Sequence, residues 1–319
     1  MTTIQTLRGP IGLDQLGQTM MHEHVFFRSY PEKWHDKIVA FARTEILELV
    51  GVGGQTLVDV GPLPQRRMDW YAEIASQVDL NIIMPTGFYV EGRTPADLRA
   101  HNEDAYVERF TGELTEGIGD SGIRAGVIKV AGNKAQLTPW EIKVMRAAAR
   151  VQRETGVPIC THACEGARSQ FDVLTKAGAD PERLYFSHVD AEFGWEGRTL
   201  TEEAKHLIEI AKEGGSLYFN NFALERDTPP EDLMFLLHVL CDKGYAHRVL
   251  FGIDANFYAD EDGTIYWEDE KTNPETAVRD YAYTFTGAIP LMRRWGFRDE
   301  DFHTFLVENP RRMFSTTRI

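Results

Sequence analysis

The stretch Gln18-Thr19-Met20-Met21-His22-Glu23-His24-Val25 places two histidines two residues apart behind a short apolar run. In a β-strand, residues i and i+2 point to the same face of the sheet. Both imidazoles would therefore face one point at the end of a strand, and imidazole nitrogen is a common ligand for zinc and similar metals. A His-x-His pair alone is more often two ordinary histidines near a surface. The metal interpretation therefore depends on whether the rest of the chain supplies further ligands.

Short apolar runs alternate with helix-like stretches on the C-terminal side of this segment. The runs are almost continuously apolar, as in parallel strands that are buried on both faces. Strands are expected at residues 18–25, 56–61, 80–87, 125–132, 158–164, 183–189, 216–221 and 248–254. Helices are expected at about residues 36–50, 68–78, 95–118, 138–155, 201–212, 230–243, 276–295 and 300–307, with a further one ending near residue 177.

Eight strand–helix units over 319 residues favour an α/β fold of the (β/α)8 TIM-barrel type over a doubly wound sheet. No linker or shift of composition divides the chain, so residues 1–319 are expected to form a single domain. The hydrophobic content of 43% is enough for a large core.

Charge and cysteine content restrict the partners and the location. The formal net charge of −15 and the pI near 5.1 argue against nucleic acid and anionic membranes as partners. The three cysteines (Cys160, Cys164 and Cys241) form no disulfide framework, which fits a reducing cytoplasm. Residues 1–10 lack an apolar signal core, and no later run is long enough to span a bilayer. A soluble cytoplasmic protein is expected.

Polar side chains recur at the ends of the expected strands, where the active sites of such barrels lie. Each has an ordinary explanation: a lone histidine at a strand end is more often a structural residue, and an aspartate can cap a loop. Lysine inside an apolar strand is harder to dismiss, because a buried ammonium must be paired, neutralised or modified. Taken together, these polar residues occur at the same depth in five strands. This favours a common site made of His22, His24, Lys129, His162, His188 and Asp254.

Six ligands are too many for one structural zinc, which takes four, but they suit two metals about 3.5–4 Å apart. Two metals need a bridging group. Neutral lysine has one lone pair and bridges poorly, whereas Lys129 carboxylated by carbon dioxide offers two oxygens.

The chain resembles the phosphotriesterase family of the amidohydrolase superfamily, and within it the phosphotriesterase-like lactonases. The resemblance extends over essentially the whole chain. It is carried by Met21-His22-Glu23-His24-Val25, Gly126-Val-Ile-Lys129, Thr161-His162, Ser187-His188, Gly252-Ile-Asp254 and the tail Val307-Glu308-Asn309-Pro310-Arg311-Arg312-Met313-Phe314.

The resemblance implies a ligand set and a mechanism. His22, His24 and Asp254 would bind the more buried metal, His162 and His188 the more exposed one, and carboxylated Lys129 both. A hydroxide shared by two divalent metals would attack the substrate, and Asp254 would take or relay its proton. Tyr89 resembles the tyrosine that the lactonases place beside the metals. It would either donate a hydrogen bond to the substrate or only line the pocket.

Two segments bear on the substrate. Where the lactonases carry an aspartate and an arginine after the seventh strand, this chain reads Phe219-Asn220-Asn221-Phe222. The unusual loop at residues 256–271 suits a substrate-covering lid. The expected lining of an apolar pocket includes Asn221, Phe257, Tyr258 and Trp267.

Three functional hypotheses follow. The first is a binuclear-metal hydrolase that opens acyl-homoserine lactones or other lactones and esters. The second keeps the site but changes the bond to a phosphotriester, a carboxylic ester or an amide. The third is a catalytically silent binding protein. Zinc is the expected metal, although cobalt, manganese and iron also suit these ligands. The expected partner is a neutral or apolar small molecule, and the resemblance favours a homodimer.

Overall fold

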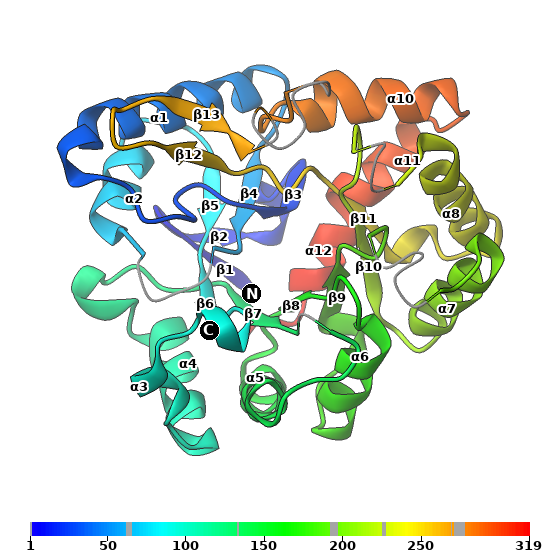
Figure 1. The fold of residues 1–319 in the computed structure, drawn as a ribbon, viewed down its shortest axis with the longest axis horizontal. Coiled ribbons are helices and arrows are strands. Elements are labelled where there is room, and N and C mark those ends of the chain that lie inside the picture. The colour runs from blue at the N-terminus through cyan, green and yellow to red at the C-terminus, as the bar shows by residue number, and fades with distance from the viewer. Residues whose placement is uncertain are drawn as a thin grey trace.

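The structure is a computed structural model that describes residues 2–61, 66–132, 134–191, 197–224, 228–268, 270 and 278–319. Its centre is a barrel with eight parallel strand positions, which we call staves because one of them consists of two short strands. The staves, in chain order, are β3 (Thr19–Glu23), β4 (Thr56–Asp59), β5 (Asn81–Ile83) continued by β6 (Pro85–Gly87), β7 (Val127–Ala131), β8 (Ile159–His162), β9 (Leu184–Ser187), β10 (Ser216–Phe219) and β11 (Val249–Phe251). Neighbouring staves pair in parallel, and β11 returns beside β3, so the predicted (β/α)8 barrel is confirmed (Figure 1).

The third stave is divided, although the sequence predicted one strand there. Pro85 has no amide hydrogen to donate to a ladder, which explains why the pairing changes at this point. β5 pairs with β4 before the division, and β6 pairs with β7 after it.

Helices surround the barrel in Figure 1 and mostly lie at the predicted positions, but residues 100–102 interrupt the helix predicted at 95–118, and residues 278–282 of the helix predicted at 276–295 are not helical. The α-helices are α1 (His35–Gly51), α2 (Met68–Ala75), α3 (Ala96–Arg99), α4 (Glu103–Thr115), α5 (Pro139–Thr155), α6 (Ala167–Lys176), α7 (Leu200–Lys212), α8 (Pro230–Asp242), α10 (Ile289–Arg294), α11 (Asp299–His303) and α12 (Asn309–Phe314). Thr138 caps α5 as its sequence predicts, because its side chain accepts the Glu141 N–H and Pro139 takes the first helical position. Residues 276–277 of the predicted helix at 276–295 lie outside the described residues.

Two antiparallel hairpins accompany the barrel. The first joins β1 (Thr3–Thr6) to β2 (Gly9–Gly12), and the second joins β12 (Phe257–Ala259) to β13 (Ile265–Trp267). The second hairpin lies within the predicted loop at 256–271 and next to α1 in Figure 1. Its contact with α1 is aromatic: the ring centroids of Phe41 and Phe257 are 5.0 Å apart.

Two apolar layers hold the barrel together. One fills the space between the staves and the helices. The other lies inside the barrel and includes Val127 of β7, Cys160 of β8, Tyr185 of β9 and Tyr218 of β10, all without solvent exposure. Each large apolar side chain buried in this way contributes about 1.5–3 kcal/mol. The inner layer forms a rigid floor beneath the carboxyl ends of the staves.

Candidate metal centre

Three of the predicted ligands converge at the carboxyl ends of β3 and β11, and we call His22, His24 and Asp254 the inner half of the site. Asp254 Oδ1 is 3.3 Å from His22 Nε2 and 3.0 Å from His24 Nε2. Ligand atoms about 2.0–2.2 Å from a tetrahedral zinc lie roughly 3.3–3.6 Å from one another. The His22 separation falls in this range and the His24 separation is slightly shorter, and ligand atoms of all three residues lie within 4.8 Å of one another, so they are close enough to share one cation.

Buried phenols fix the strand that carries both histidines of the inner half. The hydroxyls of Tyr185 and Tyr218 donate to the backbone carbonyls of Met21 and His22, at 3.0 and 3.1 Å. The hydroxyl of Tyr281 donates to the carbonyl of His24 at 2.7 Å, which adds a third such bond. The register shifts between Met20 and Glu23, and such irregularities re-aim side chains near active sites.

Glu23 holds the backbone on both sides of Asp254. Its two carboxylate oxygens accept the N–H groups of Ile253 at 3.1 Å and of Ala255 at 2.6 Å. Asp254 itself has a φ of 57°, a left-handed conformation that costs a non-glycine residue of order 1–3 kcal/mol. We interpret the Glu23 bonds as what maintains this conformation and directs the Asp254 carboxylate toward the histidines.

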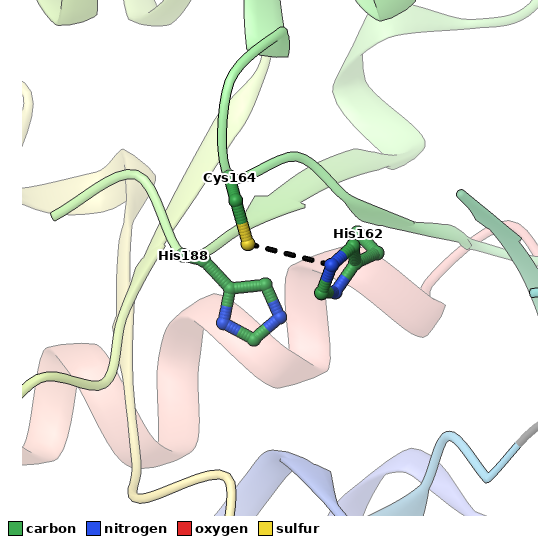
Figure 2. A group of neighbouring side chains, drawn as sticks. All are labelled: His162, Cys164 and His188. Carbon is green, nitrogen blue, oxygen red and sulfur yellow. Dashed lines mark hydrogen bonds between the residues drawn. The ribbon is translucent and has the colours of Figure 1, made fainter. Parts of the chain in front are cut away.

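His162 and His188 lie beside each other at the ends of β8 and β9, with ring centroids 4.5 Å apart, and we call them the outer half of the site. His188 also has a positive φ, of 67°. The Tyr89 hydroxyl is 3.3 Å from His162 Nε2. The Cys164 Sγ atom is 3.4 Å from the same nitrogen, and Figure 2 shows the thiol directed toward the His162 ring.

A directed chain of hydrogen bonds ends on His188. The Thr228 hydroxyl donates its one hydrogen to the Asp190 carbonyl at 2.6 Å, so its oxygen must accept from the Asn221 amide NH2 at 2.9 Å. The Asn221 oxygen then accepts from the Asn220 NH2 at 3.1 Å, which turns the Asn220 oxygen toward His188 Nδ1, 2.9 Å away. His188 must therefore carry its hydrogen on Nδ1. Its Nε2 lone pair is left available for a metal.

Lys129 lies between the two halves on β7. Its Nζ atom is 3.5 Å from His22 Nε2 and 3.5 Å from Cys160 Sγ, and its exposure is 2%. Among the described residues, no carboxylate lies within ion-pair distance of this Nζ. An unpaired ammonium buried among imidazoles is costly, which favours a chemically modified lysine.

Burial keeps the histidines in the form that binds metals. The pKa values of His22 and His162 lie well below the usual value because the rings are buried, with the nearby Lys129 and histidines adding to the effect. Burial likewise lowers the pKa of His188 to about 4. Burial alone would raise the pKa of Asp254, but His188, His24 and Lys129 outweigh it and lower this pKa. At neutral pH, His22, His162 and His188 thus offer neutral imidazoles, and Asp254 offers a carboxylate.

One buried carboxylate, Asp190, and one buried guanidinium, Arg279, support the outer half, and the sequence did not single out either of them. Asp190 Oδ2 accepts the backbone N–H groups of Asn220 and Asn221, both at 2.7 Å. The Arg279 guanidinium donates to the carbonyls of Asn220 and Ile253 and so ties the ends of β10 and β11 together. Loop residues of this kind carry no periodicity, and only their position after a strand could have drawn attention to them.

The predicted pocket residues occupy different depths. Phe257 is fully buried and Trp267 is 4% exposed, both within the core under the second hairpin. Tyr258 lies nearer the surface, where the Arg28 guanidinium is 4.7 Å from the centroid of its ring. Arg28 also stacks on Phe27, whose ring lies 4.2 Å from that of His24. Neither Phe27 nor Arg28 was predicted, and the substrate role of Asn221, Phe257, Tyr258 and Trp267 stays a prediction.

A (β/α)8 barrel that gathers four histidines, a lysine and an aspartate at the carboxyl ends of its strands defines a barrel enzyme of the metal-dependent class. Comparison with known proteins gives the family. The sequence pattern of the phosphotriesterase family matches residues 2–314. The chain belongs to the phosphotriesterase family, and it is therefore a metal-dependent hydrolase.

Several relatives span nearly the whole chain. A phosphotriesterase homology protein of Mycobacterium tuberculosis is 30% identical, covering 98% of each chain. An aryldialkylphosphatase of Saccharolobus solfataricus is 26% identical over 94% of this chain and 95% of its own. An N-acetyltaurine hydrolase of Mus musculus is 25% identical over 97% of this chain and 96% of its own. The solved structure of a phosphotriesterase from Mycobacterium tuberculosis superposes with a TM-score of 0.82 at 28% identity, covering 98% of each chain.

Proposed function

We propose that the protein is a hydrolase with two divalent metals that opens lactones, either acyl-homoserine lactones or other lactones and related esters. The observation that carries this proposal is the arrangement of two ligand groups on either side of Lys129. His22, His24 and Asp254 form one group, and His162 and His188 the other. Zinc is the proposed metal, and Lys129, carboxylated, is the proposed bridge.

The residues fit a pair of cations. His188 Nε2 is buried and has no hydrogen-bond partner among the described residues, so its lone pair is available to a cation. His22 Nδ1 is 2.5 Å from the Ser187 hydroxyl, so Nε2 can serve as its ligand atom while Ser187 orients the ring. The carboxylated form of Lys129 would replace a buried, unpaired cation with an anion that two metals share.

The chain's own groups then have distinct tasks. Bound divalent metals supply a nucleophile from water at neutral pH. Asp254, kept as a carboxylate, accepts a proton at Oδ1 or Oδ2 and returns it to the leaving group. Tyr89, 3.3 Å from His162 Nε2, is placed to donate a hydrogen bond to the substrate's carbonyl oxygen. Burial raises the pKa of Tyr89, so it stays a hydrogen-bond donor.

Amide hydrolysis is the second candidate function. The N-acetyltaurine hydrolases among the relatives are named for cleaving an amide. In this chain an amide pair, Asn220 and Asn221, stands where the lactonases carry an aspartate and an arginine. Neutral groups there remove the charge that the lactonase pattern supplies. Phosphotriester hydrolysis by the same site is a further alternative, as is a binding protein without turnover.

The test combines metal content with a substrate panel. We expect about two metals per chain in the purified protein, and faster hydrolysis of γ-, δ- and acyl-homoserine lactones than of paraoxon, aryl esters or N-acetyltaurine in a pH-indicator assay. Two metals with amide turnover only would transfer the proposal to the second candidate. Fewer than one metal per chain, not restored by added zinc or cobalt, would refute the hydrolytic mechanism.

Two further properties belong to this proposal. A homodimer is proposed from the family resemblance, and sedimentation equilibrium of the purified protein tests it directly. The proposed partner is a neutral or apolar small molecule rather than a nucleic acid or a membrane. No helix in the part of the chain that the structure describes is both long and apolar enough to cross a bilayer.

A further inference from the structure

Cys164 lies beside the two histidines of the outer half of the site. His162 ends β8, and Cys164 follows two residues later, in the turn after the strand. The Sγ atom is 3.4 Å from His162 Nε2, and ligand atoms of His162, Cys164 and His188 all lie within 4.8 Å of one another. Figure 2 shows the sulfur directed toward the His162 ring, with the His188 ring beside it.

A second observation points to the same place from the other side. His188 Nε2 is buried and has no hydrogen-bond partner among the described residues, and the amide chain through Asn220 reserves its lone pair for a metal. The residue with this unpartnered nitrogen and the residue with the thiol belong to one group of potential metal ligands. The His162–Cys164 separation is close to the roughly 3.5 Å expected between a nitrogen about 2.0 Å and a sulfur about 2.3 Å from a tetrahedral zinc.

We infer that the Cys164 Sγ atom is a ligand of the metal in the outer half, which would then be held by two imidazoles, a thiolate and the bridging Lys129 group. On binding, the S–H bond breaks, the sulfur–metal bond forms and the proton leaves to solvent. No oxidant or other reactant is needed. This inference rests on the proposed two-metal site, to which it adds a seventh protein side chain beyond the four imidazoles, Lys129 and Asp254.

The thiolate gives the two halves different metal preferences. Sulfur ligands favour zinc and cobalt over manganese, whereas the nitrogen and carboxylate ligands of the inner half accept all three. In the metal-free protein, burial raises the pKa of the Cys164 thiol to about 12, so it is not a nucleophile by itself. A metal ion is what would turn this thiol into a thiolate.

Cobalt substitution tests the inference with a readout independent of turnover. Cobalt bound to a thiolate shows a sulfur-to-metal charge-transfer band in the near ultraviolet, which histidine and carboxylate ligands do not produce. The full chain, loaded with two equivalents of cobalt, should show this band as the second equivalent binds. Cys164→Ser and Cys164→Ala should lose it, and their outer metal should bind at least about 10-fold more weakly.

Cys241 provides the matched control. It lies on α8, and the pKa of its thiol is raised by burial and by Asp301 and Asp242, neither of which belongs to the metal site. Cys241→Ser should keep the band. Cys160→Ser tests separately whether the thiol on the barrel floor, rather than that of Cys164, gives rise to the band. Circular dichroism of each variant establishes that the barrel is folded.

The outcomes separate the two proposals. Two bound cobalt ions without a charge-transfer band, or a band that survives in both Cys164 variants, would overturn the role of Cys164 and leave the hydrolase proposal standing. A folded protein that binds no pair of cobalt ions would overturn the hydrolase proposal and this inference together.

Discussion

The inner and outer halves of the site are held by different means. Hydrogen bonds to the backbone fix the inner half. Three phenol hydroxyls donate to the segment that carries His22 and His24, and Glu23 accepts the N–H groups of the residues on either side of Asp254. The outer half depends on side chains that follow one another in a row, from Thr228 through two amides to His188. The loss of one member of this row weakens the orientation of His188, whereas the loss of one of several independent bonds to a backbone leaves the other bonds in place. We therefore expect the inner metal to exchange more slowly than the outer one.

Removing the bridge should abolish the distinction between the halves and have the largest effect. Lys129→Ala deletes the proposed bridge between them, so the outer metal should be lost and activity should fall by about 1000-fold or more, several kcal/mol in the barrier. Metal analysis and turnover measure both effects, and added short carboxylates should restore part of each. Full activity with two metals in Lys129→Ala would contradict the bridging role.

Glu23→Gln should weaken the inner half selectively. The amide NH2 would face the N–H of Ile253 or Ala255, donor against donor, at a cost of about 1–3 kcal/mol. We expect the inner metal to bind about 10- to 100-fold more weakly while the outer ligands keep their geometry. Stepwise chelator titration of the cobalt protein, in which the two metals differ spectrally, measures each affinity. Equal weakening of both metals would argue against a local role for Glu23.

Asp190→Asn is the corresponding change in the outer half. Asp190 accepts two backbone N–H groups at 2.7 Å, as Glu23 does on the other side. The amide should displace Asn220, so we expect the outer metal to bind at least about 10-fold more weakly, with little change in the affinity for the inner metal. The same titration serves here. If Asp190→Asn lost the inner metal before the outer one, the proposed local role of Asp190 in the outer half would be wrong.

Thr228→Val should have the smallest effect, because it removes only the start of the hydrogen-bond row. Without the hydroxyl, the Asn221 amide can turn over and the preference of His188 for a hydrogen on Nδ1 is lost. We expect the outer metal to bind up to about 10-fold more weakly, about 1 kcal/mol. Thr228→Ser keeps a hydroxyl and should behave as the unaltered protein. Nitrogen-15 chemical shifts of the His188 ring in the metal-free protein report the tautomer directly.

The sequence predicted the staves and brought the six proposed ligands together because both depend on local periodicity. His22, His24, Lys129, His162 and His188 lie on or beside strands, and parallel strands present their carboxyl ends at one rim. Asp190, Thr228 and Cys164 follow strand ends, where alternation no longer fixes the direction of a side chain. Their grouping depends on loop geometry that only the folded chain supplies.

The second hairpin was missed although its signal was present. Apolar and aromatic residues on both sides of Asp262-Gly263 are typical of a hairpin, and Gly263 has the positive φ, of 84°, that such turns require. The sequence instead predicts this segment as a loop that covers the substrate. Phe257 and Trp267 pack on Phe41, and this burial of aromatic surface helps to hold the hairpin against α1.

The hydroxyls of Thr2 and Thr3 donate to the carbonyls of Ser315 and Ile319, which brings both ends of the described chain together (Figure 1). Arg318 N–H donates to the carbonyl of Thr155, just before β8 begins, so these ends lie at the face where the strands start. The site lies at the opposite face. A tether attached at either end to a bead or an electrode would therefore present the metal centre to the solution, and a short peptide joining the two ends would close the chain into a ring without crossing the substrate's route.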